Sequence, residues 1–596
     1  MNLKQSPDRR NGRVYLSIVR GYRCKDTGKA KSEIIESLGY LDDLEKVYPD
    51  PIAFFKEKAK QMTEVEKAKR FITLSIDLNE TLPLNYDASK NLGYAAILKL
   101  FHELDLHRFF SNQARNKPFK FNTASIMVLL VISRLLYPGS KKRAFEDKDR
   151  YFERFDFSLS DLYRSLAHFS DIAKNTVRHI SSRVEEVYGR DTTVVYYDVT
   201  NYYFEIDEED ELRRRGVSKE NRKDPVVQMG LLMDSNGIPI SYELFAGNTV
   251  DTSTFRSVIG EVKLNHDVGR IIVVADRGII SGDNVFYLTG GEKRDKALNG
   301  YVFSYSVRGS DQEFKEFVLD PSGYHDLGGV SLSPDAEFMV KSRVRYRDVY
   351  VTMQNGSKRK KTVYEKQVVF WSLKHAQRAK REREKLLQRA LALIANPAQY
   401  TRATSFGAAK YVRDVLFDKK SGEVVSSDKQ SALDIEKIRE EERFDGYYAI
   451  VTSERDMSEQ EVIDTYRGLW EIEETFRITK GTLETRPVYV STEESIQAHF
   501  LTCFIALVII RLLQKETGKQ YSADVLLDCL RSISCMHEQD NLYLLGYRSE
   551  VSDAIGRALG IDFTKRRMYQ VEIKGLLAQS KKQSTEVKKR SRKRLV

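Results

Sequence analysis

The chain has 596 residues, 41% of them hydrophobic and 31% charged, a balance typical of a soluble globular protein with ample core. At about 150 residues per domain this length predicts roughly four units. The four cysteines are too few for a disulfide scaffold, and the most apolar run, 500–513, is too short for a membrane span, so we expect reduced intracellular thiols and a buried helix. The net charge of +11 favours a polyanionic partner.

Residues 1–90 are predicted to form an N-terminal β/α unit that binds DNA. The pattern indicates strands over 13–22 and 33–41, a turn at Asp26-Thr-Gly28, a charged helix over 50–70 and a strand over 71–78. Lysine and arginine are frequent here, which fits nucleic-acid contact. A solvated terminal arm explains the same charges almost as well.

Residues 91–190 are predicted to form a helical bundle. Asn122 or Thr123 should cap a strongly apolar helix that ends before Pro138-Gly139. The stretch 162–187 predicts two helices with a break near Phe169, a helix-turn-helix shape. A bundle that only packs is the equal alternative. The basic residues expected on its surface are Arg164, Lys174, Arg178 and His179.

The pattern changes to strands in residues 191–307. Strands are predicted over 192–200, with Asp198 near the end, over 226–233 and over 238–245, with a hairpin turn at Asn236-Gly237. A helix over 252–264 precedes a continuous apolar strand, 270–276, that ends in Asp276. Three antiparallel strands, a helix and a buried parallel strand match an RNase H-like α/β core within a multidomain α+β protein.

Residues 308–444 are predicted to interrupt this core as a β-rich insertion domain. Strands over 338–353 and 362–373 flank a basic turn at Asn355-Gly356. A strand would line up every second residue on one face, and like charges in such a row repel one another unless a polyanion is present. Phosphate contact is therefore favoured over a solvated face. The row consists of Lys341, Arg343, Arg345 and Arg347.

The second part of the core is predicted over 445–515 and contains an amphipathic helix over 466–480. Tyr466, Glu473 and Lys480 are seven residues apart, so a phenol, a carboxylate and an ammonium should form one row. An ordinary surface helix with a Glu473–Arg477 pair is the alternative. A C-terminal helical region over 516–580 and a disordered basic tail over 581–596, able to hold DNA without sequence preference, complete the chain.

The carboxylates of Asp198, Asp276 and Glu473 form the candidate catalytic site. Ligand sites in α/β sheets lie at the carboxyl ends of strands, and carboxylates without histidine or cysteine partners suit Mg²⁺ or Mn²⁺. Two such ions can promote phosphodiester displacement. Each acid taken alone is more often a capping or salt-bridged residue.

Several segments together resemble the bacterial insertion-sequence DDE transposases of the IS4 type, and among them most of all the IS1634 group. They are Tyr197-Asp198-Val-Thr, Phe245-Ala-Gly247-Asn248-Thr-Val-Asp251, Ala275-Asp276-Arg277-Gly278, Leu483-Glu-Thr-Arg486-Pro487-Val488 and Ile496-Gln-Ala-His499. The family signature Tyr-x2-Arg-x3-Glu-x6-Lys fits at Tyr466, Glu473 and Lys480. Its arginine should stand at 469, where this chain has Leu469; Arg467 or Arg477 takes over the role, or the role is absent.

The resemblance implies cut-and-paste transposition. Asp198, Asp276 and Glu473 would bind two Mg²⁺ ions, with Mn²⁺ as a substitute, to cleave the element ends, and the freed 3′-hydroxyl would attack target DNA. Tyr466 and Lys480 would position phosphates, and Trp371 would stack on a flipped base or belong to the core. The implied partners are the terminal inverted repeats, target DNA and a second copy in a homodimer. The implied location is the bacterial cytoplasm and nucleoid, with no membrane.

Two other functions remain open from the sequence. One is a catalytically inactive, transposase-derived regulator that only binds DNA, although three retained acids argue against it. The other is an RNase H-like nuclease that acts on other substrates.

Overall fold

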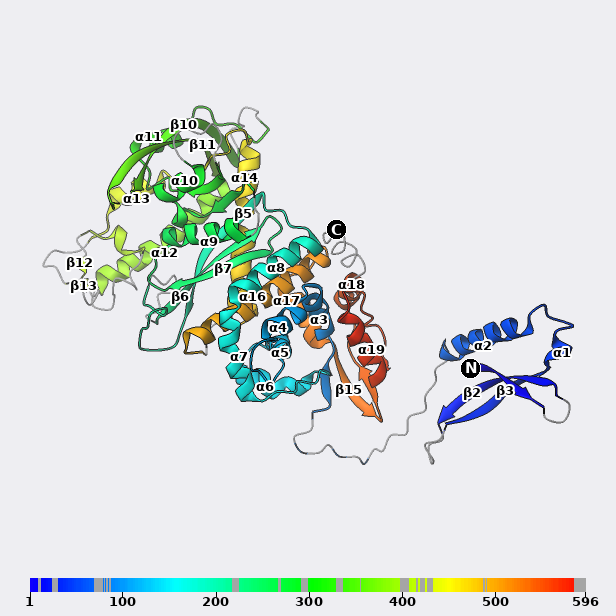
Figure 1. Ribbon diagram of the computed structural model, residues 1–596. Helices are drawn as coiled ribbons and strands as arrows, with labels where there is room; N and C mark the ends of the chain where they lie inside the picture. Colours follow the sequence, from blue (N-terminus) through cyan, green and yellow to red (C-terminus); the bar gives the residue numbers. More distant parts are fainter. Residues whose placement is uncertain are drawn as a thin grey trace. The chain divides into compact units, whose positions relative to one another are not determined.

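A computed structural model describes residues 1–583 apart from 9–11, 24–29, 69–78, 80, 82–83, 85–86, 217–223, 266–268, 291–297, 329–335, 354, 397–406, 414–415, 418–423, 426–431, 486–487 and 489. The predicted strand over 71–78 and the tail beyond 583 therefore lie outside the described residues. The chain forms two compact units, Met1–Tyr86 and Asp87–Val596. The predicted mixture of helices and sheets is confirmed (Figure 1).

The first unit is a three-stranded antiparallel sheet with a helix on it. Its strands are β1 (Asn2–Pro7), β2 (Val14–Arg23) and β3 (Ala30–Tyr40), in that order, and its helices are α1 (Leu41–Leu44) and α2 (Pro51–Ala68). Alternate apolar residues of β2, Leu16 and Ile18, are buried, as are Phe55 and Ala59 of α2. Burial of these side chains supplies the core of this unit.

The second unit begins with a helical bundle. Its elements are α3 (Tyr94–Glu103), α4 (Leu106–Ala114), α5 (Thr123–Leu136), α6 (Lys141–Glu146), η1 (Asp147–Arg150), α7 (Leu159–Asp171) and α8 (Ala173–Tyr188). The Asn122 side chain caps α5 by accepting a hydrogen bond from the Ser125 backbone N–H, as predicted. In the described part of the chain, α16 (Glu493–Glu516) is long and apolar enough to cross a membrane, but 94% of its apolar window is buried inside the protein.

Helices α7 and α8 meet at Ile172, and α7 packs against α16. Arg164, Lys174 and Arg178 are exposed, as predicted. His179 is not an exposed cation. Its ring stacks on Phe109 and its Nε2 bonds the Leu104 carbonyl at 2.9 Å, and burial lowers its pKa.

The centre of the second unit is an eight-stranded mixed sheet in the order β10-β11-β14-β9-β8-β5-β6-β7. The strand pairs β5–β8 and β8–β9 are parallel and the others are antiparallel, so the predicted three antiparallel strands and the following parallel strand are present. The strands are β5 (Val194–Tyr203), β6 (Val226–Asp234), β7 (Pro239–Ala246), β8 (Ile272–Ala275), β9 (Gly300–Tyr305), β10 (Phe338–Thr352), β11 (Lys358–Ser372) and β14 (Tyr447–Thr452).

The segment 308–444 does not make a separate β domain. Its long hairpin of β10 and β11 extends the central sheet, because β11 pairs with β14. The remaining described elements between β5 and β14 are α9 (Asp251–Asn265), η2 (Arg277–Ile279), α10 (Gly282–Thr289), α11 (Gln312–Leu319), α12 (Leu373–Ala395), η4 (Ala409–Tyr411), β12 (Leu416–Phe417), β13 (Val424–Val425) and α13 (Ile435–Glu442).

The predicted helical region over 516–580 contains strands as well as helices. The elements are α17 (Ala523–Ser532), β15 (Ser534–Gln539), β16 (Leu542–Leu545), α18 (Glu550–Leu559), β17 (Arg567–Tyr569) and α19 (Gln570–Ser580). The strands form a four-stranded sheet with β4 (Ser89–Asn91). Cys535 pairs with Lys90, which lies 445 residues earlier, so local patterning does not reveal this sheet.

The predicted continuous helix over 466–480 is wrong. The stretch contains the end of α14 (Glu459–Arg467), the whole of α15 (Trp470–Arg477) and most of the π-helical turn η5 (Ile478–Thr482). The break falls at Gly468, where the Tyr196 phenol packs so closely that a Cβ would overlap its oxygen. Gly468 and Leu469 keep helical backbone angles, so the chain continues from α14 into α15 with an altered hydrogen-bond pattern between them.

Candidate active site

Asp198 and Asp276 follow matched positions on two neighbouring parallel strands. Tyr197 of β5 pairs with Ala275 of β8, and each of these two residues is followed directly by an aspartate. Asp276 comes directly after β8, as predicted. Asp198 lies inside β5, which extends to Tyr203, and its Oδ1 accepts a hydrogen bond from the Val199 backbone N–H at 2.8 Å.

Both aspartates belong to the same face of the sheet. Tyr196 and Val274 are buried in the large core on one face, whereas Tyr197 and Ala275 are buried in the core on the other face. Side chains alternate along a strand, so positions 198 and 276 share the face of Tyr196. The sheet therefore brings the two carboxylates to one edge of one surface.

Asp276 is contacted by hydroxyl groups from two elements, and a third element supports one of them. Ser304 of β9 donates a hydrogen bond to Asp276 Oδ1 at 2.6 Å, and the Tyr466 phenol of α14 reaches the same oxygen at 3.5 Å. The phenol of Tyr448, on β14, lies 2.8 Å from that of Tyr466. Burial raises the pKa of both phenols, so they remain neutral hydrogen-bonding groups. Sequence patterns did not identify Ser304 or Tyr448. Ser304 could have been found from strand pairing, because it follows Phe303 as Asp276 follows Ala275, and these two residues are paired.

Glu473 lies on the helix that runs beside β5. At one end Gly468 packs against Tyr196, and at the other the Thr479 hydroxyl lies 2.9 Å from the Tyr202 phenol. Glu473 is between these two contacts and is exposed. Its negative charge acts on Arg378 of α12, whose pKa is raised mainly by a hydrogen bond to Glu382 and also by Glu473. Glu473 thus faces the side of the helix that is open to solvent.

The two aspartates suit a hard cation, but the full predicted triad is not assembled. Carboxylate oxygens are the ligands that Mg²⁺ and Mn²⁺ prefer. In the part of the chain that the structure describes, no three His, Cys, Asp or Glu side chains come close enough to hold a metal together. Asp198 and Asp276 are brought to matched positions by the strand pair that precedes them.

Leu469 stands where the family signature has an arginine, and both nearby arginines have acidic partners. It is buried, with 5% of its surface exposed. Arg467 pairs with Asp464 at 3.3 Å, and Arg477 lies 3.5 Å from Asp524. The ammonium of Lys480 lies 5.7 Å from the Tyr202 ring centre, which keeps it beside β5.

The predicted basic row on β10 is balanced by acidic side chains of the protein itself. The expectation that its like charges repel one another unless a polyanion is present therefore does not hold. Arg347 binds Glu365 through two nitrogens at 2.6 and 3.0 Å, and the Glu365 side chain is fully buried. Arg343 and Arg345 share Glu313, at 3.5 and 2.5 Å.

Lys341 and Trp371 are also held within the protein. Lys341 is buried, and its ammonium donates to the Asp320 carbonyl at 2.6 Å. The indole N–H of Trp371 donates to the Asp445 carbonyl at 3.0 Å, and the ring lies against Gly446, where a Cβ would overlap it.

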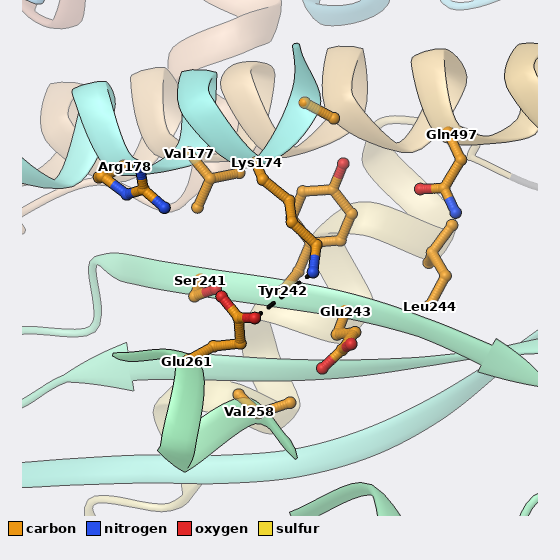
Figure 2. A pocket seen from close by; sticks show the side chains of 11 residues that line it. Lys174, Val177, Arg178, Ser241, Tyr242, Glu243, Leu244, Val258, Glu261 and Gln497 are labelled. Carbon is orange, nitrogen blue, oxygen red and sulfur yellow. Dashed lines mark hydrogen bonds and ion pairs between the residues drawn. The ribbon is translucent and has the colours of Figure 1, made fainter. Parts of the chain in front are cut away.

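A separate pocket of about 150 Å³ lies between α8, β7 and α9 (Figure 2). Lys174 and Glu261 face each other across it at 3.5 Å. Asp198, Asp276 and Glu473 do not line it. The carboxylate site is therefore separate from this pocket.

Comparison with known families gives two matches. Residues 3–70 match the model described as IS1634 family transposase, N-terminal domain, and residues 204–509, just over half of the chain, match the model described as transposase DDE domain. Asp276 and Glu473 lie inside the second match, and Asp198 lies shortly before it. No curated protein matched the chain.

Solved structures give weaker likenesses. A Mos1 transposase paired-end complex with the left transposon end is 14% identical, with a TM-score of 0.11, over 37% of this chain and 63% of that one. A pre-cleavage Mos1 transpososome is 13% identical, with a TM-score of 0.11, over 37% of this chain and 60% of that one. The chain thus spans less than two thirds of the length of either.

Proposed function

Since the chain belongs to the DDE transposases and carries an IS1634 family N-terminal domain, we propose that it moves an insertion sequence by cut-and-paste transposition. It would cleave DNA at the element ends and join the freed 3′-hydroxyl to target DNA. The single observation that supports this chemistry best is the matched placement of Asp198 and Asp276 on parallel strands. Two carboxylates on one sheet surface suit phosphoryl transfer, where charge neutralisation supplies most of the rate.

We propose an RNase H-like core made of the five strands in the order β7-β6-β5-β8-β9. Support comes from their directions, because the first three are antiparallel and the last two run parallel to β5. Such a core positions groups at the carboxyl end of β8, which is where Asp276 lies.

DDE transposases generally use divalent metals. We propose that Asp198 and Asp276, with Glu473 as the third ligand, hold two Mg²⁺ ions, for which Mn²⁺ can substitute. When bound, such ions neutralise the charge of the phosphodiester and stabilise the leaving oxygen. Ser304 and Tyr466 orient the Asp276 carboxylate. Glu473 is exposed on α15, which lies against β5, the strand of Asp198.

We propose that basic side chains around the site contact the DNA backbone. On the α14–η5 stretch the candidates are the basic residues Lys480 and Arg477, together with the phenol of Tyr466. Arg343 and Arg345, whose partner Glu313 is 64% exposed on its side chain, remain candidates on β10. Lys341, Arg347 and Trp371 are bonded within the protein, Arg347 to the buried Glu365, so a DNA contact by them requires these bonds to break. Two element ends must be joined, which favours a homodimer. We propose the cytoplasm and nucleoid as its location.

The test is a divalent-metal assay on end-labelled DNA that carries the element's own terminal repeats. The proposal predicts metal-dependent cleavage at the repeat ends followed by strand-transfer products. Specific binding without cleavage would instead identify a transposase-derived regulator. Cleavage without strand transfer or end specificity would identify an RNase H-like nuclease.

A further inference from the structure

The outward face of the β10–β11 hairpin carries three exposed tyrosines. Tyr346 is 66% exposed, Tyr350 64% and Tyr364 40%. Large aromatic side chains normally bury most of their surface, so three on one sheet face indicate a surface built for a partner. We call these three residues the tyrosine face.

Two of the rings already form a stacked platform. Tyr346 and Tyr364 are directly paired across the two strands, and their ring centres lie 4.4 Å apart at an angle of 25°. The guanidinium of Arg455 lies 4.5 Å from the Tyr364 ring centre and continues the stack. Flat rings held in this way lose little freedom when another flat group stacks on them.

The charges on this face are mainly positive. Lys358 and Lys360 share it and are exposed. The acid that β10 contributes to this face, Asp348, pairs with Lys360 at 2.7 Å. The acid on β11, Glu365, is buried on the opposite face. A polyanion therefore meets little repulsion here.

The opposite face of the hairpin is occupied. Val349, Val351 and Val363 are buried there in a core shared with β5 and β8. The arginine row on that face is neutralised by Glu313 and Glu365. The face with tyrosines is consequently the more exposed of the two.

We propose that the tyrosine face binds DNA whose bases are unstacked, such as a single-stranded end, by stacking bases on Tyr346 and Tyr350. Tyr364 supports the Tyr346 ring, and Lys358 and Lys360 contact phosphates. This inference rests on the proposed function. Every base has an aromatic face, so stacking of this kind tolerates any sequence, and neighbouring cations follow the backbone. Val340 and Val368 share the face of the tyrosines and are buried in the same core as Tyr196. The platform and the two aspartates thus lie on one side of one sheet.

The test compares the full chain with two double variants by fluorescence anisotropy, on element-end duplex with and without a single-stranded overhang. Tyr346→Ala/Tyr364→Ala should weaken binding to the overhang substrate about tenfold or more and duplex binding much less. Tyr346→Phe/Tyr364→Phe keeps both rings and should bind like the wild type. Tyr163→Ala removes another exposed tyrosine, on α7, and should have no effect. An unchanged thermal midpoint verifies folding.

A photo-crosslink from 5-iodouracil in the overhang supplies the second readout. Crosslinked peptides should contain Tyr346, Tyr350 or Tyr364. Equal binding by the alanine variant, or crosslinks confined to other elements, would overturn the inference while wild-type cleavage leaves the proposed function intact. A change in oligomeric state in place of DNA affinity would also overturn it, because the face would then bind a second copy. A wild type that binds no DNA would refute the proposed function itself.

Discussion

The phenol of Tyr466 lies 3.5 Å from Asp276 Oδ1, which joins α14 to the end of β8 across 190 residues of sequence. The same phenol lies 2.8 Å from that of Tyr448. Tyr466 therefore links the carboxylate to β14, and it orients that carboxylate together with Ser304, which donates to the same oxygen at 2.6 Å.

Replacing Tyr466 by phenylalanine removes both contacts. We expect a loss of stability of about 0.5–1.5 kcal/mol in urea unfolding, since a mostly buried hydroxyl loses its 2.8 Å bond to Tyr448 and a weak 3.5 Å contact with Asp276. Cleavage should fall about 2–10-fold, the rate equivalent of that energy. Tyr448→Phe is the matched control: it loses the same phenol pair but leaves Tyr466 beside Asp276, so its cleavage should change less. Equal rates for both variants and the wild type would show that the phenol does not orient Asp276.

We expect that Arg347 contributes mainly to the stability of the fold. Its partner Glu365 is fully buried, so Arg347→Ala leaves an uncompensated charge and should cost about 3–5 kcal/mol of unfolding free energy. Arg345→Ala should cost less than about 1 kcal/mol, because its partner Glu313 is largely exposed. Denaturant titration of both variants measures the difference. Similar small losses for the two would contradict the assigned structural role.

Gly468 should tolerate no side chain. Its backbone is helical, but a Cβ would overlap the Tyr196 phenol, so Gly468→Ala should destabilise the protein by roughly 1–3 kcal/mol. Gly481→Ala is the control, because nothing lies within 4 Å of its Cβ position; it should be neutral or stabilising by about 0.4–1 kcal/mol. Chemical denaturation distinguishes the two. A neutral Gly468→Ala would mean that α15 does not pack against β5 as described.

The buried ammonium of Lys141 should make the stability of the protein depend on pH. Its ammonium lies 2.5 Å from His499 Nδ1, and burial lowers its pKa to about 7. The unfolded chain then binds a proton that the folded chain lacks between pH 7 and about 10, so stability should rise with pH, by at most about 1.4 kcal/mol per unit. Lys141→Met should flatten this slope in unfolding experiments at pH 7, 8 and 9. Parallel slopes for variant and wild type would contradict a depressed pKa.

The sequence predicted those parts of the fold that depend on local periodicity. The strands that carry Asp198 and Asp276 were recognisable because their apolar residues form continuous or alternating runs. The break at Gly468 could not be recognised in this way, since it depends on packing against Tyr196, which is remote in the sequence.

Partners remote in the sequence explain the other misses as well. The arginine row of β10 resembled an unbalanced surface, yet Glu313 comes from α11 and Glu365 from the paired strand β11. The strand β15 pairs with a segment at the opposite end of the second unit. Charge balance and strand pairing depend on which segments meet in the folded protein, and local residue spacing does not predict this.

The most direct test of the central claim is cleavage of the element's terminal repeats by Asp276→Asn. The substitution removes a carboxylate charge and keeps the shape of the side chain, so we expect specific DNA binding within about twofold of the wild type and no detectable metal-dependent cleavage. Asp464→Asn, an exposed acid on α14, is the control and should cleave normally. Cleavage by Asp276→Asn at the wild-type rate would contradict the assignment of this carboxylate site as the catalytic centre.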